Sequence, residues 1–174
     1  MLEKNNRYKL LKIFLFNPTE EFRLRELGRL SKISPPSVMN YLREFEKEGL
    51  IKSFNKRGIP FYKAEINDEK FREYKKISIF FELNDSGLAD FLWDELSPRA
   101  IILYGSYSKG ESTENSDLDL FIMGKEKKIN LDRYEKKLGL SIHLFFEENV
   151  KKLPRELKNN LINGIVIRGY LKLF

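Results

Sequence analysis

The chain has 174 residues, 41% of them hydrophobic and 33% charged, which suits one medium or two small soluble domains and excludes a disordered chain. Cysteine is absent and histidine occurs once, so disulfide bonds, cysteine-based zinc sites and histidine-rich metal sites are excluded. No apolar run approaches about 18 residues, and residues 1–4 do not begin a signal peptide. We therefore expect a cytoplasmic protein without a membrane partner.

The positive charge is concentrated in the N-terminal part. Residues 1–66 hold 14 Lys and Arg against 8 Asp and Glu, whereas residues 67–174 hold 18 of each, so the net charge of +6 belongs to the first part alone. Such asymmetry favours a polyanionic partner for that part. A solvated basic surface would explain the charge equally well, so charge alone leaves both interpretations open.

The first predicted elements are two helices. Apolar residues recur at helical spacing from Tyr8 to Leu15, and this helix is expected to stop at Asn17 and Pro18. A second, shorter helix is marked by leucines three residues apart: Leu24, Leu27 and Leu30.

A third helix follows directly. Ser34 precedes Pro35 and Pro36, a pattern typical of an N-cap and a first helical turn. Gly49 is expected to end the helix. Its buried face consists of residues four and three apart: Val38, Leu42 and Phe45.

A basic hairpin is predicted next. Residues 50–54 and 61–66 form two strands around a tip at residues 55–58. Three helices followed by a basic hairpin resemble the winged helix-turn-helix family, and residues 34–51 are similar to its recognition helix and the start of its wing. This resemblance implies a DNA-binding domain over residues 1–66.

In winged-helix proteins the third helix enters the major groove, led by its N-terminal residues. Asn can read adenine, and Ser and Arg suit phosphates as well as base edges. Lys56 and Arg57 would reach a phosphate or the minor groove from the wing. Charge and motif together favour double-stranded DNA over a domain used only for protein contacts. Once the buried face is excluded, the candidate contacts on the third helix are Pro36, Ser37, Asn40, Tyr41 and Arg43.

Residues 67–98 are interpreted as a helical connector. Asp68 can cap a helix whose apolar residues are Phe71, Tyr74 and Ile77, and residues 84–87 break it. A further helix is expected over residues 88–96. These apolar helices suit packing within the chain, which is the simpler interpretation, or a homodimer interface, since winged-helix proteins commonly bind two half-sites as dimers.

The chain is organised around a stretch that begins with an apolar strand over residues 100–104. Gly105 and Ser106 break this strand, so the predicted order is strand, turn, strand. Gly105 allows a sharp turn and a close approach of backbone N–H groups to a phosphate, and Ser106 adds a hydroxyl donor.

The second apolar strand carries two carboxylates, Asp117 and Asp119. Because side chains alternate along a strand, these aspartates share one face while Leu118 and Leu120 point into the core. Two such carboxylates can converge on a divalent cation, and magnesium favours a few carboxylates together with water and substrate phosphate. These are the parts of a metal-assisted phosphoryl- or nucleotidyl-transfer site.

This stretch has two other interpretations. A phosphate-binding P-loop is rejected because Glu111 follows Gly110 where that motif needs Lys. The two aspartates alone could equally be a solvated strand face. The combination of apolar strand, Gly-Ser, ten intervening residues and Asp-x-Asp resembles the minimal nucleotidyltransferases of the DNA polymerase beta superfamily, from Arg99 onward.

This resemblance implies roles for the quoted residues. Asp117 and Asp119 would be catalytic metal ligands, and Gly105 and Ser106 would bind the nucleotide. The implied cofactor is Mg²⁺ or Mn²⁺, with an NTP as ligand or substrate. The family often includes antitoxins that modify or sequester a helical toxin, so a HEPN-type partner protein is also implied.

The third strand, predicted over residues 140–146, departs from the family pattern. The family places a third metal carboxylate in the middle of this strand, and the matching position holds His143, which the resemblance makes the third candidate catalytic residue. His143 could be an unusual metal ligand, although imidazole suits transition metals better than magnesium. It could instead accept the proton of an attacking hydroxyl. The third interpretation, which we favour, is that the carboxylate is lost and nucleotide is bound without efficient turnover.

The C-terminal segment is expected to form an amphipathic helix over residues 149–163, with Pro154 in its first turns, and then an edge strand over residues 164–170. The basic face of this helix could help to hold a triphosphate, but a solvated face is the simpler interpretation.

The predicted fold class is α/β (α+β), with an N-terminal winged helix-turn-helix and a C-terminal nucleotidyltransferase-like domain whose short mixed sheet is flanked by helices. The expected domains are residues 1–66, a connector at 67–98, and residues 99–174. The leading hypothesis is a DNA-binding transcriptional regulator or antitoxin-like protein with a metal- and nucleotide-binding domain. The alternatives are an active Mg²⁺-dependent enzyme that transfers NMP from NTP to a protein, small molecule or nucleic acid, and a structural partner that uses neither site.

Overall fold

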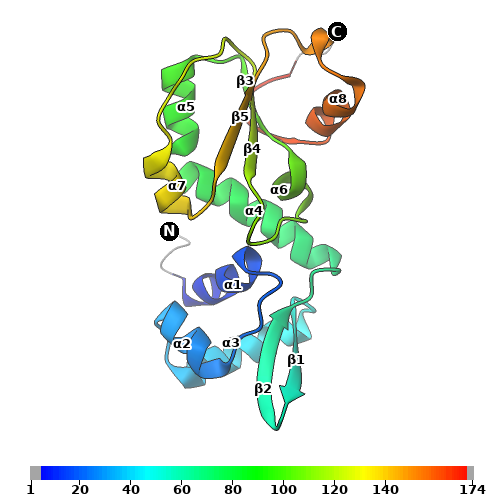
Figure 1. Cartoon of the computed structure of the whole chain (residues 1–174). Helices are drawn as coiled ribbons and strands as arrows, with labels where there is room; N and C mark the ends of the chain where they lie inside the picture. Colours follow the sequence, from blue (N-terminus) through cyan, green and yellow to red (C-terminus); the bar gives the residue numbers. More distant parts are fainter. Residues whose placement is uncertain (1–4, 172–174) are drawn as a thin grey trace. The chain divides into compact units, whose positions relative to one another are not determined.

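The computed structural model describes residues 5–171, and the chain divides into two compact units at residues 1–78 and 79–174. The division falls within the long helix α4 (Glu69–Asp85), and each unit is described by itself (Figure 1). None of the described helices is both long enough and apolar enough to span a membrane.

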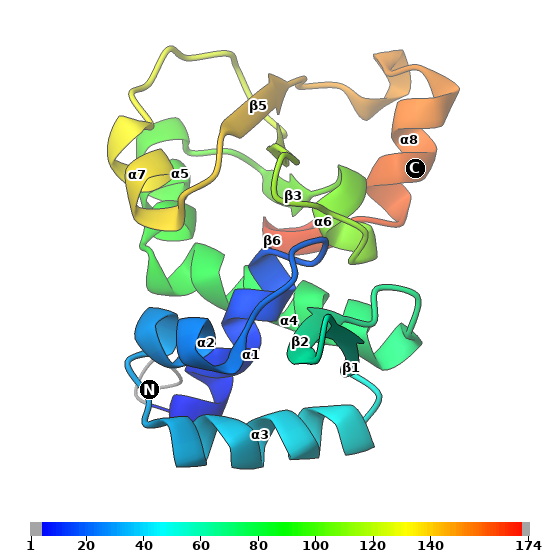
Figure 2. The same ribbon diagram turned by 60° about the horizontal axis from the view of Figure 1, so that its bottom comes forward.

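The N-terminal unit contains three helices followed by an antiparallel hairpin and the first part of α4 (Figure 2). The first strand ends two residues later and the second begins two residues earlier than predicted, so they are joined by a two-residue turn in place of the expected four-residue tip. Arg57 and Gly58 form this turn with φ of 51° and 78°, the backbone geometry that tight hairpin turns require. The elements are α1 (Asn6–Phe16), α2 (Leu24–Ser31), α3 (Pro35–Lys47), β1 (Ile51–Lys56) and β2 (Ile59–Ala64).

The spacing of apolar residues decides which of the predicted helix faces are buried. Val38, Leu42 and Phe45 are fully buried, as their steps of four and three residues predict. Both helices that were marked by three-residue steps form, but Leu30 is 56% and Ile77 62% exposed, so these steps do not follow a single buried face. Each three-residue step falls about 60° short of a full turn of a 3.6-residue helix, so the third residue has rotated away from the core.

The start of α3 differs in detail from the predicted cap. Ser34 occupies the N-cap position, but its hydroxyl donates to Ser37 Oγ at 3.0 Å and makes no capping bond with the helix backbone. Pro35 and Pro36 lack the N–H groups that the first turn would otherwise offer. At α4, by contrast, the Asp68 carboxylate accepts a hydrogen bond from the Phe71 N–H at 3.0 Å and caps the helix as predicted.

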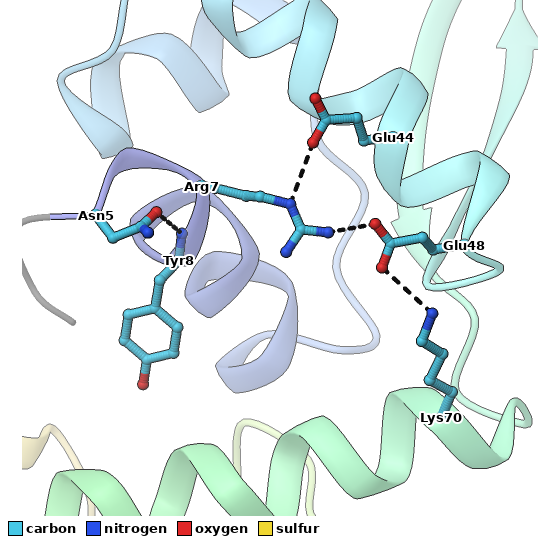
Figure 3. Close-up of polar contacts among 6 residues, drawn as sticks. All are labelled: Asn5, Arg7, Tyr8, Glu44, Glu48 and Lys70. Atoms are coloured by element: carbon cyan, nitrogen blue, oxygen red, sulfur yellow. Dashed lines mark hydrogen bonds and ion pairs between the residues drawn. The ribbon is translucent and has the colours of Figure 1, made fainter.

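A polar network joins three helices of the N-terminal unit (Figure 3). Arg7 of α1 donates to Glu44 at 3.2 Å and also pairs with Glu48, both on α3, and Lys70 of α4 pairs with Glu48 at 3.3 Å. The Arg7 guanidinium also lies over the Phe45 ring. Burial alone would raise the pKa of Glu48, but its bonds and charge interactions with Arg7 and Lys70 lower it overall.

The C-terminal unit is built on a four-stranded mixed sheet with the strand order β5-β4-β3-β6. Strands β3 and β4 are antiparallel, β3 and β6 are antiparallel, and β4 and β5 are parallel. The last strand lies at an edge, as predicted. The elements are α5 (Leu88–Leu96), β3 (Ala100–Leu103), α6 (Gly105–Lys109), β4 (Leu118–Ile122), α7 (Asp132–Leu138), β5 (Ile142–Phe146), the 3-10 helix η2 (Val150–Lys152), α8 (Arg155–Ile162) and β6 (Ile165–Gly169).

Two predicted segments of this unit take a different form. A short helix, α6, replaces the turn predicted after the first strand, because Gly105 (φ 72°) redirects the chain and Gly110 (φ 72°) ends the helix one turn later. The single helix predicted over residues 149–163 is divided into η2 and α8. Leu153 is extended because it precedes a proline, and Pro154 becomes the N-cap of α8.

The core of the C-terminal unit surrounds the two central strands. All four residues of β3 are fully buried, and Leu118, Leu120 and Phe121 of β4 are at most 1% exposed. The segment of η2 and α8 packs against one face of the sheet through Val150, Leu153 and Leu161. The rigid centre therefore fixes β4, whose N-terminal end carries the predicted carboxylates.

Candidate functional site

The pairing of β4 with β5 brings the predicted site residues together. Asp119 and His143 are direct partners in this parallel register. Leu118 and Leu120 are buried while Asp119 remains partly exposed, as strand alternation predicts. Asp117 lies immediately before the first residue of β4.

These three side chains form a small, open polar cluster. His143 Nδ1 lies 3.8 Å from Asp117 Oδ2 and 3.8 Å from Asp119 Oδ1. Their side chains are 63%, 45% and 30% exposed, in the order His143, Asp117, Asp119. Because 3.8 Å exceeds hydrogen-bonding distance, the imidazole faces both carboxylates without a direct bond to either.

The two negatively charged carboxylates of the cluster lie close to a single imidazole. Burial raises the pKa of Asp119, the charge of Asp117 raises it further, and His143 lowers it, with a net upward shift. A neighbouring cation would relieve the repulsion between the two carboxylates. The chemistry of the pair therefore favours a positively charged ligand.

Because Gly105 has no side chain, the Asp119 carboxylate can lie beside it. A Cβ atom on Gly105 would lie 2.5 Å from Asp119 Oδ2, closer than real contacts allow, and φ of 72° is unfavourable for any other residue. In addition, the Tyr104 N–H donates to the Asp119 carbonyl at 3.1 Å. Gly105 was expected to let a phosphate approach, whereas its close approach to Asp119 was not expected, because it arises only when α6 packs beside β4. Ser106 lies half-buried in the first turn of α6.

Tyr107 was not singled out from the sequence. Its ring is buried, and burial together with the charge of Asp117 raises the pKa of its phenol to about 12 despite a hydrogen bond with Ser112. The chain then reaches Asp117 through a turn in which Ser116 Oγ accepts from the Thr113 N–H at 2.8 Å. A lone aromatic residue in an otherwise polar segment was the available signal that this segment is anchored.

The two aspartates suit a divalent cation that keeps water and phosphate among its ligands. Magnesium is commonly bound by one or two carboxylates plus substrate phosphates. Within residues 5–171, however, no group of three or more His, Cys, Asp or Glu side chains is arranged to hold a metal ion. His143 adds a nitrogen where magnesium prefers oxygen. The residues thus fit a cation shared between the protein and a nucleotide more closely than an all-protein metal site.

The DNA-contact candidates lie on α3 and the hairpin of the N-terminal unit (Figure 2). Pro36, Asn40 and Arg43 are exposed, and Arg57 is exposed at the hairpin turn. The other three candidates are less available. Ser37 is half-buried and accepts a hydrogen bond from Ser34, Tyr41 packs partly against the core, and Lys56 pairs with Glu21.

Lys56 has further contacts within its own hairpin. Its ammonium lies over the rings of Phe54 and Phe61, 5.5 and 5.4 Å from their centroids. The sequence could not reveal the pairing with Glu21, because the two residues are 35 positions apart.

Comparison with protein families agrees with this geometry in the C-terminal unit. Residues 87–171 match the family model described as Polymerase beta, Nucleotidyltransferase. The match begins before Arg99 and so includes α5, which the sequence analysis assigned to the connector. No curated protein and no solved structure matches the chain. A nucleotidyltransferase-family domain is therefore present at residues 87–171.

Proposed function

We propose that the chain is a DNA-binding regulator of the antitoxin type whose nucleotidyltransferase-family domain binds a metal–nucleotide complex and turns it over poorly. The N-terminal unit binds double-stranded DNA through α3 and the hairpin, in the manner of a winged helix. Asp117 and Asp119 hold Mg²⁺ or Mn²⁺ together with the phosphates of an NTP, and Gly105 and Ser106 flank those phosphates.

One observation carries the proposal for the C-terminal unit. The residue facing both aspartates from the neighbouring strand is His143, at 3.8 Å from each, where the family resemblance leads us to expect a third carboxylate. Two carboxylates suffice for a cation shared with phosphate oxygens. A bound divalent cation would supply charge neutralisation of the phosphates. A third carboxylate would help to activate an attacking hydroxyl, and within residues 5–171 none completes this group.

Nucleotide binding and nucleotide turnover are expected to differ, so both are measured in the same samples. Each NTP is titrated with Mg²⁺ against the full chain, and pyrophosphate release is followed separately. We expect saturable, magnesium-dependent binding with little release of pyrophosphate. Fast release with any acceptor would overturn the regulatory assignment.

The variant Asp117→Asn tests whether nucleotide binding depends on the proposed metal site. It removes a negative charge that offsets the cation, so magnesium-dependent nucleotide binding should fall below detection. The matched control is Asp94→Asn, because Asp94 is an exposed aspartate on α5 outside the cluster. Nucleotide binding that ignores both magnesium and Asp117→Asn would mean that the nucleotide site lies elsewhere.

The second candidate is an active nucleotidyltransferase that transfers NMP from NTP to a protein, small molecule or nucleic acid. The observation in its favour is the imidazole itself, which faces both aspartates and has the chemistry of a general base. Under this alternative, His143→Asn should abolish transfer while nucleotide affinity is kept.

The proposed regulator acts as a homodimer on paired half-sites, and its partner is a HEPN-type protein. The support is the winged-helix resemblance of residues 1–66 and the family resemblance of the C-terminal part. Co-expression with a candidate partner, followed by mass analysis of both chains, tests whether that partner is sequestered or covalently modified.

A further inference from the structure

The N-terminal unit contains a pocket whose residues have no assigned role, and any contact that it makes with DNA rests on the proposed function. The pocket has a volume of about 830 Å³ and is lined by residues of α2, of the segments on either side of this helix, and by the first residue of α3. Its apolar lining includes Ile33, Pro35 and the backbone at Gly28. A Cβ atom on Gly28 would lie 3.2 Å from the Ile33 carbonyl oxygen, so a larger residue would crowd the turn that forms this lining.

The polar lining of the pocket is strongly basic. Arg23, Arg25 and Arg29 line it, with Glu26 as the one carboxylate. The Arg23 guanidinium stacks over the Phe61 ring at 4.9 Å, an arrangement that leaves the N–H groups at its edge free to donate. The carboxylate of Glu26 accepts a hydrogen bond from the Arg23 backbone N–H at 3.3 Å and is engaged locally.

The positive charges of Arg25 and Arg29 are not paired with an acidic group in the part of the chain that the structure describes. Neither Arg25 nor Arg29 has a side-chain hydrogen bond or ion pair with any residue from 5 to 171. They stand at positions i and i+4 of α2, where like charges are neighbours on the helix surface and destabilise it. An anion bound between them would turn this repulsion into attraction.

The chemistry of the pocket specifies the class of ligand. Guanidinium groups bind phosphate oxygens in a planar, bidentate manner. A volume of about 830 Å³ falls within the range of small-molecule sites, and the apolar lining suits a sugar or base beside the phosphate. We propose that this pocket binds the phosphate group of a nucleotide, which either belongs to a free mononucleotide or is part of a DNA strand lying across α2 and α3.

The experiment observes the arginines directly in the full chain. The side-chain Nε–Hε signals of Arg25 and Arg29 are assigned by NMR from the signals lost in Arg25→Lys and Arg29→Lys. AMP and, separately, a short mixed-sequence duplex are then titrated with EDTA in excess, which silences magnesium-dependent binding in the C-terminal unit. Shifts of both signals with AMP identify a free nucleotide as the ligand, and shifts with the duplex alone identify a DNA phosphate.

The affinity arm uses matched double variants. Arg25→Ala with Arg29→Ala should weaken binding of the probe that shifts the signals by at least about tenfold. Lys9→Ala with Lys128→Ala removes the same charge from exposed positions outside the pocket, α3 and the hairpin, and should leave most of the affinity. Unshifted arginine signals with both probes overturn the proposal, and so do equal losses in the two double variants. Duplex or magnesium–NTP binding that persists in those samples shows that the pocket proposal alone has failed.

Discussion

The two candidate sites use charge in opposite ways. On α3 and the hairpin, positive groups are spread over a surface, and some already have partners, as Lys56 has in Glu21. In the C-terminal unit, two carboxylates face one imidazole at 3.8 Å, and burial, together with the charge of Asp117, raises the pKa of Asp119. A dispersed surface should tolerate single substitutions, whereas the cluster should depend on the position of individual atoms.

Gly105→Ala should give the largest effect, because it tests this dependence on position. The new methyl group would lie 2.5 Å from Asp119 Oδ2, so the carboxylate must move. We expect magnesium-dependent nucleotide binding to fall more than tenfold, together with a loss of about 1–2 kcal/mol of unfolding free energy from the left-handed backbone. Isothermal titration and urea unfolding measure the two effects.

Gly139→Ala is the control for backbone strain. Gly139 has a similar φ of 69°, but a Cβ there meets nothing within 4 Å. It should lose similar stability and keep nucleotide binding. If both variants bind nucleotide equally well, the close approach of Gly105 to Asp119 does not affect nucleotide binding. The cluster would then depend less on the position of individual atoms than we predict.

The second prediction concerns the Arg7–Glu48–Lys70 network, in which opposite charges are paired. The folded-state pKa of Glu48 is lowered, so its contribution to stability is complete above the unfolded-state value and is lost as pH falls through the folded-state value. Glu48→Gln should lower the unfolding free energy by about 1 kcal/mol at neutral pH. The gap between wild type and variant should close as the pH falls below about 4.5.

Urea unfolding at several pH values measures this gap, with Glu20→Gln as an exposed control. A gap that stays constant with pH would show that the carboxylate charge is not what stabilises the network.

The third and smallest effect is expected on the hairpin. Arg57 is exposed at the turn, so Arg57→Ala should reduce the slope of log affinity for duplex DNA against log salt by about 0.9, the value of one phosphate contact. Lys56→Ala should change the slope less, because Lys56 already pairs with Glu21. Electrophoretic or fluorescence titrations over a range of salt decide the order. Equal changes in both variants would mean that the Glu21 pair opens when DNA binds.

The parts of the fold that depend on local periodicity were predictable. Strand alternation correctly gave the shared face of Asp117 and Asp119, and steps of four and three residues gave the buried face of α3. The parts that failed have physical reasons. A five-residue helix such as α6 is too short to show a period, so a turn was predicted in its place.

Long-range contacts were beyond any local pattern. The burial of Tyr107, the space that Gly105 leaves for Asp119 and the pairing of Lys56 with Glu21 all join segments that only the folded chain brings together. The position of His143 facing the aspartates was expected only through the family resemblance. The register of two parallel strands cannot be derived from the sequence of either strand alone.

The measurement that tests the central claim most directly compares wild type with His143→Asp. Pyrophosphate release is followed with Mg²⁺ and each NTP from pH 5 to 9, and nucleotide affinity is measured in parallel. If the missing carboxylate limits turnover, wild type should bind nucleotide with little release, and His143→Asp should raise the rate more than about tenfold at similar affinity. Fast release by wild type, lost in His143→Asp, would contradict the account and make His143 a working base.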